Sequence, residues 1–146
     1  MDSNAIIAQL NELAPPALKT LRGKAVSFDS ESRTLVMEFV AADRFTHSGG
    51  IVQGGFVTGM IDAAMANAVY ATLQELVVAP TLEIKVSFLE IARAGKLVAS
   101  GRVVRMGKSI AFMDGELRST DGQLLATATS TVRVMHPKTV NHGQPA

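Results

Sequence analysis

The segment 45–74 constrains the fold of this 146-residue chain more than any other part of it. Its thirty residues contain no Lys, no Arg and a single carboxylate, Asp62. Two glycine pairs mark a loop near its start, and a helix without strong breakers is predicted from Gly55 to about Leu73. Because this helix is apolar nearly all round, we expect protein rather than water to surround it.

The rest of the chain predicts one short helix and about five or six strands. Residues 3–13 have helical apolar spacing and end before two prolines, with Ser3 or Asn4 as the expected cap. Residues 24–40 are typical of two strands around a polar turn. Further strands, with apolar side chains at alternate positions in the first, are expected at 81–88, 96–106, 109–118 and 122–135.

These elements must share one core. The simplest solution is an α+β fold, in which a curved antiparallel sheet of five to six strands wraps around one long central helix. The strands after residue 95 are joined by short turns, which indicates an antiparallel meander. The length corresponds to one domain, 1–146, with an N-terminal helical segment at 1–23 and a frayed tail at 136–146.

Composition excludes several classes of function. Lys plus Arg is 14 and Asp plus Glu is 13, so neither nucleic acid nor a membrane is the expected partner. The chain has no Cys, which excludes disulfides, a thiolate nucleophile and Cys-ligated zinc, and its three His show no metal-ligand spacing. We therefore expect no cofactor. An acid at position 2, with no basic stretch after it, does not predict a signal peptide, and a cytoplasmic location is expected.

Asp62 is the main candidate for chemistry. An unpartnered carboxylate in apolar surroundings costs several kcal/mol, so its presence suggests a site, although a core acid held by hydrogen bonds is the alternative. The glycine pair ending at Gly55 leaves backbone N–H groups accessible at the start of the helix. Such groups can stabilise the oxyanion that develops on a carbonyl substrate.

The spacing of the two groups predicts a dimer. Gly54 and Asp62 are eight residues apart, which is about 12 Å along a helix. One carbonyl cannot easily contact both within one chain, so a twofold partner must supply one of them. His47 lies before the glycine loop, either as a hydrogen-bonded structural residue or as a participant, whereas His136 and His142 lie in the tail.

At this point the residues match a known family. The segments HSGGIVQGGFVTGMIDAAMA and PTLEIKVSFLEIARAGKLVASGRVVRMGKSIAFMDGELRSTDGQLLATATSTVRV resemble hotdog-fold acyl-CoA thioesterases of the phenylacetate-degradation (PaaI-like) type over about residues 24–135. The resemblance implies that two protomers form a continuous sheet with the active sites between them. It also implies that the amide of Gly54 binds the thioester oxygen, and that Asp62 of the opposite subunit is nucleophile or general base.

The resemblance assigns further positions, with two departures. The family's motif histidine is Gln53, which can donate a hydrogen bond but cannot act as acid or base near neutral pH, and its usual asparagine is His47. Thr81 occupies the position that orients the attacking water. The turn RMGKS offers three phosphate contacts for coenzyme A, although an ordinary polar turn explains it equally well; these are Arg105, Lys108 and Ser109.

The resulting hypothesis is hydrolysis of an acyl-CoA thioester by a homodimer, with dimers expected to pair further. Donors such as Thr58, on the same helix, or Thr81, across the interface, would keep Asp62 ionised. The acyl channel is expected beside the helix, lined by Phe56, Met60 and Met65, although such methionines also fit a plain core. The alternatives are a non-catalytic acyl-CoA-binding sensor and a hotdog hydratase or dehydratase built on His47 and Asp62. The acyl group itself is not predicted.

Overall fold

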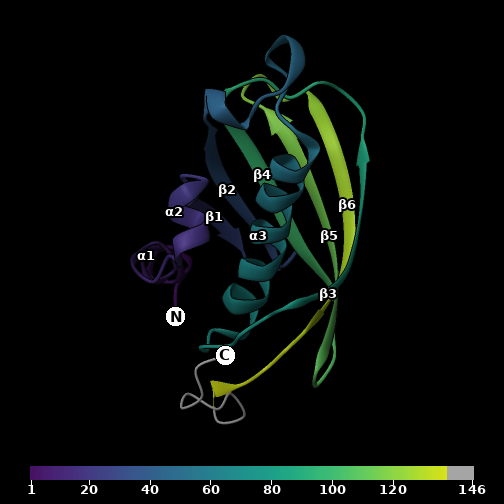
Figure 1. Cartoon of the computed structure of the whole chain (residues 1–146). Coiled ribbons are helices and arrows are strands. Elements are labelled where there is room, and N and C mark those ends of the chain that lie inside the picture. The colour runs from purple at the N-terminus through teal and green to yellow at the C-terminus, as the bar shows by residue number, and fades with distance from the viewer. Residues whose placement is uncertain (138–146) are drawn as a thin grey trace, which may run out of the picture.

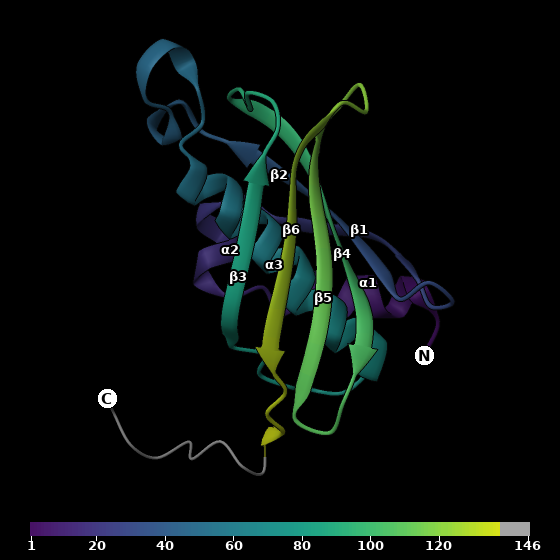
Figure 2. The same ribbon diagram turned by 90° about the vertical axis from the view of Figure 1, so that its right-hand side faces the viewer.

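The computed structural model describes residues 1–137, and it confirms the α+β prediction: a six-stranded antiparallel sheet curls around one 20-residue helix (Figures 1 and 2). The predicted elements agree with the observed ones to within a few residues, except for a short second helix that was not expected. The elements are α1 (Ser3–Glu12), α2 (Pro16–Thr20), β1 (Lys24–Asp29), β2 (Thr34–Ala41), α3 (Gly54–Leu73), β3 (Thr81–Phe88), β4 (Gly95–Met106), β5 (Ile110–Ser119) and β6 (Leu124–Arg133).

The sheet order is β1-β2-β4-β5-β6-β3, with every neighbouring pair antiparallel. The predicted meander is present from β4 to β6. In contrast, β3 does not pair with β2 or β4, because the chain crosses the sheet after α3 and adds β3 beside β6. This places β3 at an open edge, as Figure 2 shows, where one row of its backbone N–H and C=O groups has no strand partner among residues 1–137.

Two glycines allow α3 to lie directly on the sheet. Gly101 of β4 and Gly115 of β5 are cross-strand partners below the middle of the helix. A methyl group built on Gly101 would lie 2.5 Å from Met65 Cα, and one on Gly115 would lie 2.6 Å from Ile61 Cγ2. Such distances are too short for carbon atoms, so the close approach of helix and sheet requires glycine at both positions.

Only one face of α3 is covered by the sheet. Met60, Ala64 and Met65 on that face have no exposed surface, whereas Asp62 and Ala63 on the other face are only half-buried. The expectation that protein surrounds the helix is therefore wrong for the single chain, because composition alone could not distinguish the two faces. By length and composition α3 could also cross a membrane, but here it is the core helix of the sheet.

The N-terminal segment packs against the same core. Asp2, not Ser3 or Asn4, caps α1, since its carboxylate accepts a hydrogen bond from Ala5 N at 2.8 Å. Asn11 exchanges two hydrogen bonds with the backbone of Ala25 and so attaches α1 to β1. The unexpected α2 begins at its N1 proline, which has a backbone angle suited to that position. The predicted frayed tail falls largely outside the described residues, since 138–146 are not among them.

Candidate active site

The loop before α3 is held in place by backbone hydrogen bonds. His47 N donates to Ile51 O at 2.8 Å, and Gln53 N donates to Phe45 O at 2.9 Å. Gly49 and its neighbour adopt φ angles of +68° and +72°, which glycine tolerates and most other residues do not. The loop therefore delivers the chain to the start of α3 in a fixed conformation.

Gly54 begins α3 and lines a hollow of about 350 Å³, which we call the glycine-loop hollow. Gln53 is the N-cap residue and makes no side-chain cap, and within residues 1–137 the N–H of Gly54 has no acceptor. The ring of Phe88 lies over Gly54, only 3.0 Å from where a β-carbon would be. The hollow is lined by His47, Ile51, Val52, Gly54, Phe88, Leu89, Glu90, Ile91 and Ala92.

Asp62 lies two helical turns further along, at a second hollow of about 540 Å³, which we call the acid hollow. Its carboxylate accepts a hydrogen bond from Thr81 Oγ1 at 2.6 Å, the only side-chain hydrogen bond it makes within residues 1–137. No Lys or Arg in that part of the chain forms an ion pair with it. The other lining residues are nearly all apolar: Pro15, Ala17, Leu18, Leu21, Gly59, Ala63, Ala66, Asn67, Ala79, Pro80 and Thr81.

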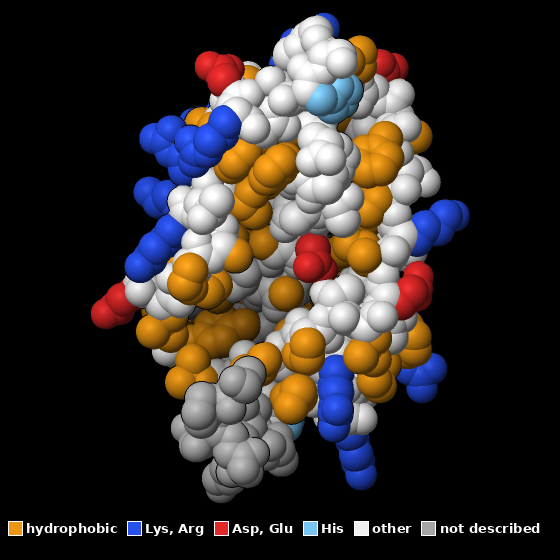
Figure 3. Space-filling model, viewed as in Figure 1, with side chains coloured by type: hydrophobic (Ala, Val, Ile, Leu, Met, Phe, Trp, Pro, Cys, Tyr) orange, Lys and Arg blue, Asp and Glu red, His pale blue; other side chains and the backbone are white. Residues whose placement is uncertain are grey.

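The surroundings of Asp62 correct three expectations. The acid is half-buried beside an open hollow rather than enclosed in the core. Thr81 donates to Asp62 of its own chain, not across an interface, because β3 runs back along α3. Thr58 does not support the acid, because its hydroxyl donates to Gly54 O at 2.8 Å, four residues earlier in the same helix. Figure 3 shows this side of the molecule, where apolar side chains border the depression and the basic ones lie at the margins.

A single chain does not bring the predicted catalytic groups together. No residue lines both hollows, so Gly54 and His47 belong to one and Asp62 and Thr81 to the other. His47 and Asp62 are likewise separate within the chain, which removes an intramolecular pair of the kind that a hydratase would need.

The other predicted lining residues divide between loop and core. The ring of Phe56 stacks on Phe45 with their centroids 4.1 Å apart, which attaches the first turn of α3 to the loop. Gly55 is exposed beside Gln53. Met60 and Met65 are completely buried against the sheet, and neither lines the acid hollow. The structure therefore places these two methionines in the core.

The predicted coenzyme A contacts lie at the opposite end of the sheet from Gly54. Arg105, Lys108 and Ser109 are exposed at the turn between β4 and β5. The other end of β4 pairs with the end of β2, directly before the glycine loop, as Figure 1 shows. Within one chain these three residues cannot contact a ligand bound at Gly54.

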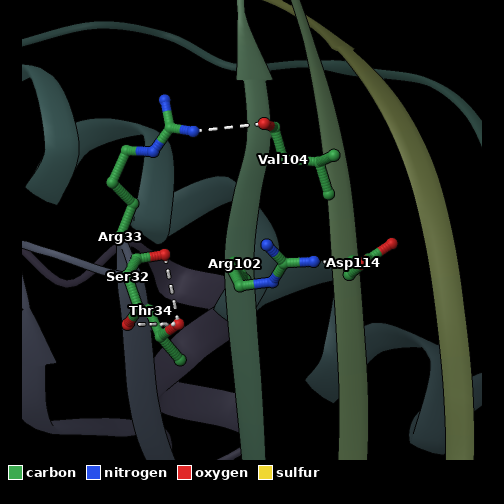
Figure 4. A network of polar contacts seen from close by, with 6 residues as sticks. All are labelled: Ser32, Arg33, Thr34, Arg102, Val104 and Asp114. Carbon is green, nitrogen blue, oxygen red and sulfur yellow. Dashed lines mark hydrogen bonds and ion pairs between the residues drawn. The ribbon is translucent and has the colours of Figure 1, made fainter.

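A further hollow of about 480 Å³ lies on the outer face of the sheet, away from α3. Its floor is made of short side chains, and charges of both signs border it, including Lys85 and Glu116. Arg102 donates to Asp114 at 2.7 Å across two neighbouring strands (Figure 4). None of the predicted site residues lines this hollow.

Sequence reasoning missed two parts of the site. Phe88 lies over Gly54, yet its alternation with Val86 indicates only an ordinary strand residue. Leu18 of the unpredicted α2 and Leu21, which caps the end of that helix, form a wall of the acid hollow. A proline at position 16, typical of a helix N1 position, is the one signal that could have revealed α2.

Comparison with known proteins places these features in context. The family model described as Thioesterase superfamily matches residues 49–126, which include Gly54, Asp62 and Thr81. A phenylacetic acid degradation-related protein of Ralstonia eutropha JMP134 is 36% identical, with a TM-score of 0.78, over 88% of this chain and 98% of its own. A thioesterase of Haemophilus influenzae is 20% identical, with a TM-score of 0.80, over 94% of each chain. A Streptococcus mutans UA159 protein bound to acetyl CoA is 23% identical, with a TM-score of 0.68, over 78% of this chain and 89% of its own. The last two show a shared fold.

Proposed function

The chain belongs to the thioesterase superfamily and has the hotdog fold that its sequence resembles, and we propose that it hydrolyses acyl-CoA thioesters to a free acid and CoA. The observation that carries this proposal is Asp62, whose carboxylate accepts a side-chain hydrogen bond from Thr81 alone among the described residues 1–137, at a hollow lined almost entirely by apolar side chains. A solved neighbour that holds acetyl CoA supports the substrate class. We further propose that the reaction takes place in the cytoplasm.

The active unit in this proposal is a twofold dimer that pairs along the open edge of β3. Leu82 and Phe88 of this edge strand are 57% and 56% exposed, and Leu89 and Ile91 beyond it are similarly exposed. A long apolar edge left free would favour aggregation, so pairing with a second copy removes that liability. Pairing along β3 also extends the six-stranded sheet continuously into the partner.

The dimer would join the two kinds of hollow. Gly54 of one subunit would face Asp62 of the partner subunit, because the two positions lie about 12 Å apart along α3 of one chain and a twofold partner would supply the missing group at each site. The Gly54 N–H, which has no acceptor within residues 1–137, would donate to the thioester oxygen as negative charge develops there. Gln53 would donate to the carbonyl or sulfur, and His47 would border the leaving group.

Asp62 would act by one of two routes. As general base it would take a proton from water, whose oxygen attacks the thioester carbon while the C–S bond breaks and the thiolate of CoA leaves. As nucleophile it would itself attack that carbon and expel the thiolate of CoA, which leaves a mixed anhydride; water then hydrolyses the anhydride to the free acid and regenerates the Asp62 carboxylate. In a single turnover in oxygen-18 water, label recovered in Asp62 would establish the anhydride route, because the general-base route places it only in the acid product.

Arg105, Lys108 and Ser109 would contact the phosphates of coenzyme A from the partner subunit, because their own chain holds them at the wrong end of the sheet. Lys108→Ala should therefore raise KM for acyl-CoA several-fold and leave kcat unchanged. An unchanged KM would remove this turn from the site.

Replacement of the acid is the direct test. Asp62→Asn keeps the size of the side chain and removes its charge, so kcat should fall at least about 100-fold while the dimer persists in sedimentation. The matched control is Asp114→Asn, another half-buried acid but on the outer face of the sheet, which should retain full activity. Normal CoA release by Asp62→Asn would contradict the mechanism, and no CoA release by the wild-type protein would favour a sensor.

We also propose that dimers pair through the outer face of the sheet. The hollow there carries Lys85 and Arg102 next to Asp114 and Glu116, so a twofold copy could place each charge against its opposite. Lys85→Glu should then convert tetramers to dimers in sedimentation velocity and retain activity. Tetramers that survive this change would exclude the outer face as their contact.

A further inference from the structure

Gly59 is a glycine in the interior of α3 that the packing of the chain does not explain. It lies one turn before Asp62 and lines the acid hollow. Glycine lowers helix stability relative to alanine, because it loses more backbone freedom on folding. Its presence inside a helix therefore needs a reason, either close packing or space for something else.

Close packing is the reason for other glycines next to this helix, but not for Gly59. At Gly101 and Gly115 an added methyl group would lie about 2.5 Å from atoms of α3. At Gly59 the nearest atom to an added methyl group is Leu21 Cδ1 at 3.7 Å, an ordinary van der Waals distance. Within the described chain a side chain fits here, so the space beside Gly59 is available to a ligand.

The space at Gly59 continues into the acid hollow. Leu21 and Leu18 of the N-terminal segment form one wall, and Ala63 and Ala66 of α3 form the other. This volume of about 540 Å³ has an apolar lining and begins beside the carboxylate of Asp62. An acyl chain whose thioester carbon lies at Asp62 would enter this space directly.

We propose that Gly59 and Leu21 together set the size of the acyl group, with α2 and the turn after it forming the specificity wall. This inference rests on the proposed function, because it concerns the acyl group of the same substrate. The hollow selects apolar acyl groups of medium length or with one aromatic ring. Each methylene that enters an apolar site contributes about fourfold in affinity, so a change in available length is measurable.

Two opposite substitutions test the proposal. Gly59→Val fills the space beside the helix and should lower kcat/KM for octanoyl and phenylacetyl substrates at least tenfold. The kcat/KM for acetyl and butyryl substrates should stay the same. Leu21→Ala enlarges the acid hollow and should raise kcat/KM for decanoyl and longer substrates relative to hexanoyl. The controls are Leu13→Ala, an exposed leucine at the end of α1, and Thr72→Val, a β-branched change on α3 away from the hollow; neither should shift the length preference.

A second readout separates this inference from hydrolysis itself. Dissociation constants of non-hydrolysable thioether analogues of acyl-CoA, measured by calorimetry for the same variants, should show the same opposite shifts in preferred chain length. If the wild-type protein binds these analogues but hydrolyses no thioester, hydrolysis fails while the size filter stands. If both variants change the dissociation constants of analogues of every chain length equally, the inference is overturned. It is likewise overturned if Gly59→Val dissociates the dimer, because Gly59 would then serve assembly or folding.

Discussion

Both faces of α3 contain small and apolar side chains, but the two faces have different surroundings. Towards the sheet, Met60, Ile61, Ala64 and Met65 are completely buried. Away from it, small residues and Asp62 border a hollow instead of a packed layer. Small and apolar side chains therefore serve packing on one face of this helix and border open space on the other, and only the neighbouring elements distinguish the two uses.

The largest loss of stability is expected from a substitution where the covered face of α3 meets the sheet. Gly101→Ala would place a methyl group against the backbone of α3, which cannot move aside as a flexible side chain can. We expect the free energy of unfolding to fall by more than about 3 kcal/mol, above the usual range for overpacking. Urea unfolding followed by circular dichroism measures this loss.

The open face supplies the matched control for that change. Gly59→Ala should raise the free energy of unfolding by about 0.5–1 kcal/mol, because a methyl group fits there and alanine favours the helix. Equal destabilisation by both substitutions would show that the two faces are packed alike, and the difference on which the acid hollow depends would disappear.

A second pair of variants compares side chains on the same two faces. Met65→Ala removes a completely buried side chain and leaves the Ser130 hydroxyl, now 3.4 Å from Met65 Sδ, without that contact. It should cost about 3 kcal/mol of unfolding free energy. Asn67→Ala, on the open face, should change it by no more than about 0.5 kcal/mol. Thermal unfolding of the two variants under identical conditions gives the difference, and a loss at Asn67 as large as that at Met65 would contradict it.

The sequence predicted the fold because local patterns were strong. Alternation at 81–88 and an unbroken helical segment ending near Leu73 each indicated one structure, and the sheet had to curl around the helix to share a core. The position of β3 beside β6 was not predictable from these patterns, since it depends on a crossover that no local residue specifies.

The candidate site was predicted less completely. Asp62 stood out because an acid is rare in such a segment, and Gly54 because a glycine pair precedes a helix. The partner of the acid was assigned to the wrong chain, because the sequence does not tell which strand returns along α3. The wall from α2 was missed since a five-residue helix carries too little periodic signal. The sequence does not distinguish Gly59 from Gly101, because the two glycines differ only in the space around them.

The smallest expected effect, a modest loss of kcat, concerns the hydrogen bond that Thr81 donates to Asp62 on the open face of α3. Thr81→Val removes the hydroxyl that donates to Asp62 at 2.6 Å and keeps the shape and strand propensity of the side chain. Because the hydroxyl orients the carboxylate without binding the acyl group, kcat should fall about tenfold, or about 1.4 kcal/mol, while KM stays constant. Thr81→Ser restores a hydroxyl and should recover most of the activity. A rise in KM with kcat unchanged would instead assign Thr81 to substrate binding, and Asp62 would then have to be oriented by the partner subunit.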